Sequence, residues 1–322
     1  ATTIHRLLGA SKETTRYLFN KDHLLPYDVV VVDEASMIDL PLMAKLVEAL
    51  SKQTRLILLG DVDQLSSVMS GTVLGQLCDK TAGAFFSKEF VNQAREVLGV
   101  TTDLKTIGTP NVTLPDLVVT LNQSYRFKEG SGIDKFSREV NQGNAQPALG
   151  ILLDRQLPDI NWKEVPDKKM LKDYLETVIL EKGTNYLKAN SIEEKWELFN
   201  QFQILCTHSK GIGGVETVNR LAENILEQAG LIRPRDYWYQ GQPILITQND
   251  HQLKVFNGDI GLVFPTRDDT RNREDVLQAF FPLGGGQFRS IPLRQLPNHQ
   301  TAYAITVHRS QGSEFDRILL VL

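Results

Sequence analysis

The sequence predicts an α/β protein in which helices cover parallel β-sheets. Short apolar runs alternate with segments whose apolar residues recur at helical spacing, as in a parallel sheet with crossover helices. Acidic and amide residues directly follow two of these runs, where the carboxyl ends of parallel strands present ligand sites. A later stretch of short β-like runs with regular turn signals predicts a small inserted β-barrel.

The bulk composition is that of a globular protein with room for several domains. The chain has 322 residues, 41% of them hydrophobic and 23% charged. Its formal net charge of −4 gives no global basic field that would attract nucleic acid. A DNA partner is not excluded, because a motor protein can confine its basic groups to a channel.

Cysteine usage and hydropathy indicate the compartment. Cys78 and Cys206 are far apart and outside any C-x-x-C motif, so we expect no disulfide scaffold and no zinc site. No segment approaches about 18 uninterrupted apolar residues, and the N-terminus lacks a secretion-signal layout. We therefore expect a cytoplasmic protein with no membrane partner. Both ends lie within patterned segments, and we expect them to be cuts through a fold.

The first 150 residues carry the pattern of one α/β domain. Pro41 opens a helix whose apolar residues Leu42, Leu46, Val47 and Leu50 recur at helical spacing. The elements expected are a helix over 3–9, a hairpin over 14–25, strands over 29–32 and 56–59, helices after Pro41 and over 73–78, a strand over 118–121 and a helix over 133–141.

A second α/β domain follows, with a strand over 203–206 and a helix over 215–228. Turn signals such as Asn257-Gly258 mark the β module inserted into it. The boundaries expected are a first α/β domain over 1–150, a helical connector over 151–200, a second α/β domain over 201–235 and 300–322, and the insertion over 236–299.

Two acidic residues follow four consecutive valines. Asp33 and Glu34 come directly after Val29–Val32, in the form of a Walker B element. In that interpretation Asp33 holds Mg²⁺ and Glu34 activates the attacking water. The alternative is a helix cap after a buried strand. The polar segment 60–64, at the end of the next strand, favours the nucleotide interpretation.

Gln64 and Arg126 complete the candidate nucleotide residues. A neutral amide such as that of Gln64 can hydrogen-bond both a γ-phosphate oxygen and a water. Arg126 follows the expected strand over 118–121, where its charge can stabilise a transferring phosphoryl group. The alternatives are a loop amide for Gln64 and a solvated or structurally paired arginine for Arg126.

Candidate nucleic-acid residues occur in three places. Thr3 and His5 can bind a DNA phosphate or stack on a base, and the alternative is a helix cap and a satisfied histidine. The glycine-rich loop after Thr207 can bind a single-stranded backbone or be an ordinary β–α turn. The segment between the last two strands is dense in donors and predicts a ligand-facing role; it contains Thr306, His308, Arg309, Gln311, Gly312 and Glu314.

Together these elements resemble superfamily 1 DNA helicases of the 5′-to-3′ branch, and within it the alpha-subunit family of exodeoxyribonuclease V. The motifs that carry the resemblance are TIHRLLG (3–9), VDEASM (32–37), LGDVDQL (59–65), QSYRF (123–127), FNGDIG (256–261) and TVHRSQGSEFD (306–316).

The resemblance implies two RecA-like domains that close on ATP and Mg²⁺, single-stranded DNA across their top, and an SH3-like insertion. It implies duplex unwinding in a recombination and repair complex with the beta and gamma subunits of exodeoxyribonuclease V, and a strand-separating hairpin near Asn20. By resemblance Asp33 binds Mg²⁺, Glu34 is the base, and Gln64 and Arg126 contact the γ-phosphate. Gly312 and Glu314 lie near the nucleotide, and Thr306 and His308 couple it to DNA.

Two family elements are missing from the sequence. No G-x-x-x-x-G-K-[ST] phosphate loop occurs, and neither does the family's final arginine motif. We therefore expect this chain by itself to hydrolyse ATP poorly or not at all. Two alternatives stay open: another helicase of the same branch, and a non-catalytic scaffold that binds DNA or partners.

Overall fold

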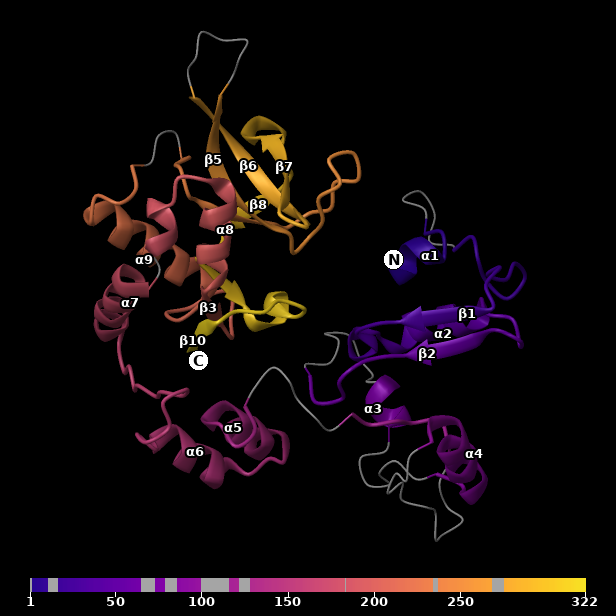
Figure 1. The fold of residues 1–322 in the computed structure, drawn as a ribbon. Helices are drawn as coiled ribbons and strands as arrows, with labels where there is room; N and C mark the ends of the chain where they lie inside the picture. Colours follow the sequence, from indigo (N-terminus) through magenta and orange to yellow (C-terminus); the bar gives the residue numbers. More distant parts are fainter. Residues whose placement is uncertain are drawn as a thin grey trace. The chain divides into compact units, whose positions relative to one another are not determined.

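A computed structural model describes residues 2–10, 17–64, 73–78, 86–99, 116–121, 128–182, 184–233, 237–267 and 275–322. The chain divides into two compact units, Ala1–Trp162 and Lys163–Leu322 (Figure 1). The finer domain boundaries expected from the sequence stay predictions. Within the part that the model describes, no helix is long and apolar enough to cross a membrane.

The first unit is built around a two-stranded parallel sheet. Strand β1 (Val29–Val32) pairs with β2 (Arg55–Leu58), and α2 (Leu40–Glu48) makes the crossover. The Asp39 carboxylate begins α2 because it accepts a hydrogen bond from the Leu42 N–H over 2.7 Å. One face of the sheet is buried against this helix, as the helical spacing predicts.

Short helices surround this sheet or follow it. They are α1 (Ile4–Leu7), the 3₁₀ turn η1 (Ala35–Met37), α3 (Val73–Leu77), α4 (Lys88–Leu98), α5 (Gly132–Asn141) and α6 (Ala145–Leu153). The last two pack as a helical pair. Asp159 accepts from the backbone N–H groups of Gly132 and Ile133, at 3.0 and 2.9 Å, and caps α5. These bonds hold the pKa of Asp159 below its usual value.

The prediction of a strand over 118–121 is wrong. These residues form no strand, and Leu121 is 90% exposed. An apolar run forms a strand only where a neighbouring strand takes its backbone hydrogen bonds. No described segment pairs with this one.

The second unit contains a three-stranded parallel sheet with β3 (Phe202–Cys206) at its centre. Strand β10 (Arg317–Val321) pairs with one edge and β9 (Ala304–Thr306) with the other. The helices beside it are α7 (Lys168–Lys182), η2 (Asn185–Lys188), α8 (Ile192–Asn200) and α9 (Val215–Gln228). The last has the bounds that its sequence pattern predicts, and Val218, Ala222 and Leu226 bury its apolar face.

A five-stranded antiparallel sheet lies between α9 and β9 in the sequence. Its order is β7-β6-β5-β4-β8, and Ile244, Val263, Phe281 and Ile291 are buried in its core. The strands are β4 (Pro243–Ile246), β5 (Ile260–Arg267), β6 (Asp275–Gly284), β7 (Gln287–Pro292) and β8 (His299–Thr301), and the turn η3 (Leu293–Gln295) follows β7. This confirms an inserted β module, and its SH3-like form stays a prediction.

Candidate functional site

The carboxyl ends of β1 and β2 meet at one edge of the first sheet. The Leu59 N–H donates to the Val32 carbonyl over 2.8 Å, and the Ala35 N–H donates to the Leu59 carbonyl over 2.8 Å. The pairing therefore continues past the strand ends. It places Asp33 and Glu34 beside the segment that starts at Gly60.

The backbone of Glu34 adopts a left-handed conformation, with φ of 52°. Its N–H donates to the Asp33 carboxylate over 3.0 Å, and η1 begins at the next residue. A positive φ is uncommon for a residue with a side chain, and such conformations cluster at functional sites. The side chain of Asp33 is exposed and that of Glu34 is half-buried.

A side chain at Gly60 would crowd the acidic turn. A Cβ atom there would lie 3.1 Å from the backbone nitrogens of Ala35 and Ser36, and 2.8 Å from a methyl group of Leu74. Ser36 is buried, and its hydroxyl has no hydrogen-bond partner among the described residues. Sequence reasoning missed both features, although a glycine between a strand and Asp61 is a signal of close backbone approach.

Gln64 ends a tight turn at the same edge of the sheet. The Asp61 carboxylate accepts from the Asp63 N–H over 2.9 Å, and the Asp61 carbonyl accepts from the Gln64 N–H over 3.3 Å. The side chain of Gln64 is half-buried. The turn thus holds Gln64 at the edge that carries Asp33 and Glu34. Arg126 lies outside the described residues.

Thr3 and His5 lie at the start of α1. The Thr3 hydroxyl accepts from the Arg6 N–H over 3.3 Å, so this side chain caps the helix. His5 is exposed, and its ring centroid lies 6.2 Å from that of Tyr17. The capping interpretation of Thr3 is therefore correct, and a role toward DNA for these residues stays a prediction.

In the second unit, the predicted residues gather at the carboxyl edge of the β10-β3-β9 sheet. Thr306 is the last residue of β9 and pairs in register with Cys206, the last residue of β3. Thr207 comes next, and its N–H donates to the Val321 carbonyl over 3.2 Å. The Thr207 hydroxyl lies 2.7 Å from Nδ1 of His208.

The remaining predicted residues lie between β9 and β10. His308 is exposed within η4 (Val307–Ser310), and Glu314 is exposed further along. Gly312 has φ of 76° and is also exposed. A glycine suits this position, because residues with side chains rarely adopt that conformation.

The loop after Thr207 is held by its own hydrogen bonds. The carbonyls of His208 and Ser209 accept from the first N–H groups of α9, at 3.0 and 3.1 Å, and the Thr217 hydroxyl donates to the Gly211 carbonyl over 2.7 Å. These contacts explain the loop as a β–α turn. Lys168, Lys210, Glu216 and Arg220 line an open hollow beside it.

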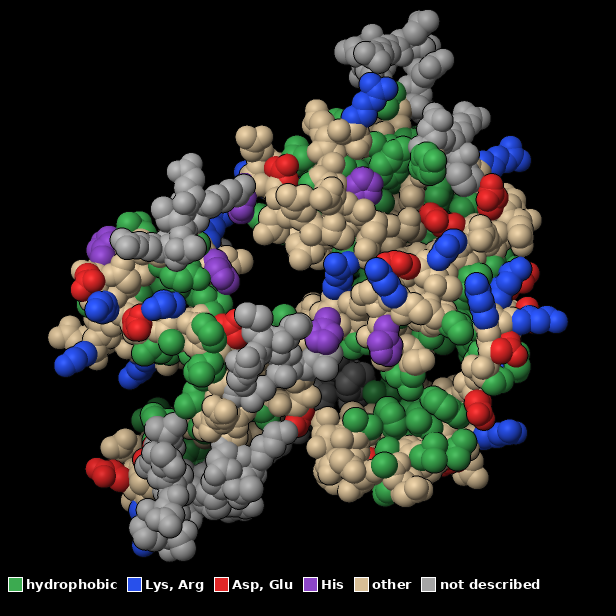
Figure 2. Space-filling model, turned by 180° about the vertical axis from the view of Figure 1, so that it is seen from behind, with side chains coloured by type: hydrophobic (Ala, Val, Ile, Leu, Met, Phe, Trp, Pro, Cys, Tyr) green, Lys and Arg blue, Asp and Glu red, His purple; other side chains and the backbone are tan. Residues whose placement is uncertain are grey.

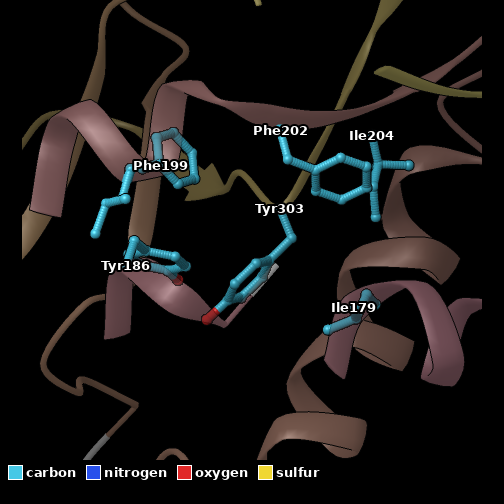
Figure 3. A pocket seen from close by; sticks show the side chains of 7 residues that line it. Ile179, Tyr186, Phe199, Phe202, Ile204 and Tyr303 are labelled. Atoms are coloured by element: carbon cyan, nitrogen blue, oxygen red, sulfur yellow. The ribbon is translucent and has the colours of Figure 1, made fainter. Parts of the chain in front are cut away.

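A separate cavity in the core of the second unit is too small for a ligand. Tyr303 lies in its middle, with Tyr186 and Phe199 on one side and Ile179 and Ile204 on the other (Figure 3). Its volume of about 20 Å³ accommodates little more than one water molecule. None of the predicted site residues lines it.

The electrostatic character of the surface is mixed. Lysine and arginine side chains of the second unit alternate with acidic ones on the face seen in Figure 2. Among the residues that the model describes, no three His, Cys, Asp or Glu side chains gather as a metal cluster. Mg²⁺ needs no such cluster, because it binds one or two carboxylates together with waters and substrate phosphates.

Residues 1–70 match the model of the protein family described as "AAA domain". The RecBCD enzyme subunit RecD of Buchnera aphidicola (from Acyrthosiphon pisum) is 32% identical over 100% of this chain and 53% of its own length. RecD of Haemophilus influenzae is 34% identical over 100% of this chain and 50% of its own. The ATP-dependent RecD2 DNA helicase of Deinococcus radiodurans is 28% identical over 100% of this chain and 36% of its own length.

Among solved structures, Bacteroides Pif1 bound to ssDNA aligns with a TM-score of 0.45 and 18% identity, over 99% of this chain and 72% of that chain. The chain spans about half the length of the curated RecD relatives it matches.

The fold class is that of RecA-like parallel α/β domains, as the alternating strands and helices predict. Within that class the chain is related to RecD, the subunit of the RecBCD enzyme, and the relationship covers its whole length. The resemblance that the motifs predict is therefore confirmed.

Proposed function

We propose that this chain belongs to an ATP-dependent 5′-to-3′ DNA helicase subunit of the exodeoxyribonuclease V type. In this proposal ATP hydrolysis drives movement along single-stranded DNA and unwinds the duplex. The observation that supports it is the shared carboxyl edge of β1 and β2, joined by the bond between Ala35 and Leu59, because Asp33 and Glu34 follow one strand there and Gln64 lies soon after the other. That edge is where parallel α/β proteins bind nucleotides.

Each residue of this edge has a role that suits its chemistry. Asp33, an exposed carboxylate, would hold Mg²⁺, which supplies charge to the transferring phosphoryl group when bound. Glu34 would accept a proton from the attacking water. Gln64 would hydrogen-bond the γ-phosphate, and Arg126 would stabilise the charge that develops on it.

The second unit would supply the other contacts. Gly312 and Glu314 are proposed near the nucleotide. Thr207, Thr306 and His308 are proposed to bind single-stranded DNA, together with Thr3 and His5 from the first unit. This assignment is supported by the gathering of Thr207 and Thr306 at one sheet edge. Hydroxyl and imidazole groups of this kind bind phosphate oxygens or stack on bases.

The proposed setting follows from the RecD relatives, which are named as subunits of the RecBCD enzyme. We propose the beta and gamma subunits of exodeoxyribonuclease V as partners, in cytoplasmic DNA recombination and repair.

The test is ATP hydrolysis by the protein as it is encoded in its gene, with and without single-stranded DNA. We expect stimulation by DNA, and a loss of at least about 100-fold in kcat for Glu34→Gln, since general base catalysis contributes that much or more. Glu96→Gln is the control, because Glu96 is an exposed glutamate on α4. We expect it to leave the rate unchanged.

The alternatives predict different results. A scaffold that only binds DNA or partners gives binding without hydrolysis in the wild-type protein. Another helicase of the same branch gives DNA-stimulated hydrolysis without association with the beta and gamma subunits. Wild-type hydrolysis that Glu34→Gln leaves unchanged contradicts the assigned base.

A further inference from the structure

Asn219 is a buried polar residue of α9 whose side chain reaches the backbone of β9. Its Oδ1 accepts from the Ala304 N–H over 2.7 Å, and its Nδ2 donates to the Ala304 carbonyl over 3.0 Å. The same Nδ2 donates to the Thr301 carbonyl over 2.8 Å. Only 7% of Asn219 is exposed, so these three bonds form away from water.

This side chain takes the place of a missing strand neighbour. Strand β9 is an edge of the β10-β3-β9 sheet, so one of its sides has no strand partner there. A primary amide offers the same donor and acceptor pair as a backbone peptide group. Asn219 can therefore satisfy the Ala304 backbone as a neighbouring strand would, and buried backbone groups need such partners.

The attachment point lies just before the residues proposed to bind DNA. Thr306 is two residues beyond Ala304, and η4, which contains His308, begins directly after it. Two residues of strand span roughly 7 Å. If Ala304 moves, Thr306 therefore moves with it, because only one residue of the same strand lies between them.

We propose that Asn219 is a positioning residue, which holds the edge of β9 and thereby places Thr306 and His308 for single-stranded DNA. This inference rests on the proposed function and assigns a role to a residue that contacts neither nucleotide nor DNA.

A second residue of α9 also bonds to the segments that flank the β module, but not to β9. Glu223, one helical turn after Asn219, accepts from the Thr301 hydroxyl over 3.1 Å and from the Tyr239 hydroxyl over 3.0 Å. It fastens the entry and exit of the β module to α9. Of these two residues, Asn219 is the one that bonds β9 itself.

The experiment compares three variants of the protein as encoded. Asn219→Ala removes all three bonds. Asn219→Asp keeps the size and the acceptor for the Ala304 N–H, but removes both donated bonds. Tyr186→Phe is the control: it removes the hydroxyl that donates to the Gly241 carbonyl over 2.9 Å and that hydrogen-bonds the Tyr303 side chain, and it leaves the bonds of Asn219 to Ala304 in place.

Two quantities are measured: the single-stranded DNA concentration that gives half-maximal ATP hydrolysis, and hydrogen exchange of the peptide covering 304–310. For Asn219→Ala we expect the DNA concentration to rise at least about tenfold and the exchange to quicken at least about tenfold, because one lost buried hydrogen bond already has that scale and this variant loses three. Asn219→Asp should be impaired at least as much as Asn219→Ala, because it puts a buried carboxylate oxygen against the carbonyl oxygens of Thr301 and Ala304. Tyr186→Phe should change neither quantity.

Unchanged DNA dependence in Asn219→Ala overturns the proposal, and so does an equal rise in Tyr186→Phe. A wild-type protein that single-stranded DNA does not stimulate contradicts the proposed function. The exchange measurement then decides the positioning role separately, and unchanged exchange over 304–310 in Asn219→Ala overturns it.

Discussion

The backbone N–H of Ala35 donates a hydrogen bond to the carbonyl oxygen of Leu59 over 2.8 Å. This bond joins the turn after β1 to the end of β2. Because of it, Asp33 and Glu34 share one sheet edge with Gln64, although about 30 residues of chain, including α2, separate them. The position of the candidate catalytic residues thus depends on a hydrogen bond between two backbone groups, and no side chain takes part in it.

Gly60→Ala is expected to disturb this contact. The added methyl group would lie 3.1 Å from the nitrogens of Ala35 and Ser36, which are backbone atoms that cannot move independently. Overpacking of this kind costs about 1–3 kcal/mol. We expect a lower thermal midpoint and a loss of ATP hydrolysis larger than the loss of stability explains. Thermal unfolding measures the midpoint, and an ATPase assay measures the rate of hydrolysis.

Gly150→Ala is the control for that change. Gly150 lies within α6, and a Cβ atom there meets nothing within 4 Å. Alanine is a better helix former than glycine by about 1 kcal/mol, so this variant should be neutral or slightly stabilised. Equal losses of activity in the two variants would contradict the importance of the close approach at Gly60.

Asn20→Ala is expected to loosen the turn that resembles the strand-separating hairpin. The Asn20 side chain accepts from the Asp22 N–H over 2.9 Å and donates to the carbonyls of Tyr17 and Leu18. We expect duplex unwinding to fall several-fold, while DNA-stimulated ATP hydrolysis stays within about twofold, since the turn lies outside the nucleotide edge. Asn92→Ala, an exposed change on α4, should affect neither assay. Parallel loss of unwinding and hydrolysis in Asn20→Ala would argue against a separating role.

Burial of Lys195 is expected to make the free energy of unfolding rise with pH in the alkaline range. It is fully buried, and its ammonium group donates to the carbonyls of Tyr186 and Leu187 at 2.7 and 3.0 Å. Burial lowers the pKa of Lys195 from 10.5 to about 8. Between these two values the unfolded chain binds a proton that the folded chain has lost. The folded state therefore gains stability as the pH rises through this window, by up to about 3 kcal/mol.

The measurement is chemical unfolding at several pH values from 7 to 10.5, for the wild type and Lys195→Met. The free energy of unfolding of the wild type relative to Lys195→Met should rise above pH 8, because methionine has no proton to lose. Lys45→Met removes a lysine whose side chain is 51% exposed, and it should give no such trend. A flat difference between wild type and Lys195→Met would show that the pKa is not lowered.

Cys206 is expected to resist thiol reagents in the folded protein. It is fully buried, and burial raises its pKa to about 11, so its reactive thiolate is scarce at pH 8. Cys78 is half-buried, and burial raises its pKa as well. With iodoacetamide at pH 8 we expect Cys78 to react slowly and Cys206 only after unfolding in urea. Single Cys→Ser variants assign the labelled residue, and labelling of Cys206 at the rate of Cys78 would contradict its burial.

Local patterns predicted most elements of both units. Four valines predicted β1, and the apolar spacing over 215–228 predicted α9 with its observed bounds. Both succeed because the pattern marks a buried face that the neighbouring element covers. The run over 118–121 has the same apolar character, yet it forms no strand, since strand pairing requires a partner that the run itself does not specify.

The sequence by itself determined the α/β class, the order of elements and the residue types of the candidate site. These properties follow from local periodicity and from motifs short enough to read along the chain. The tertiary structure decided the left-handed turn at Glu34, the close approach at Gly60 and the bonds of Asn219 to Ala304, which is 85 positions away. Such features depend on contacts between distant segments, and local sequence preference carries no information about which distant backbone group will need a partner.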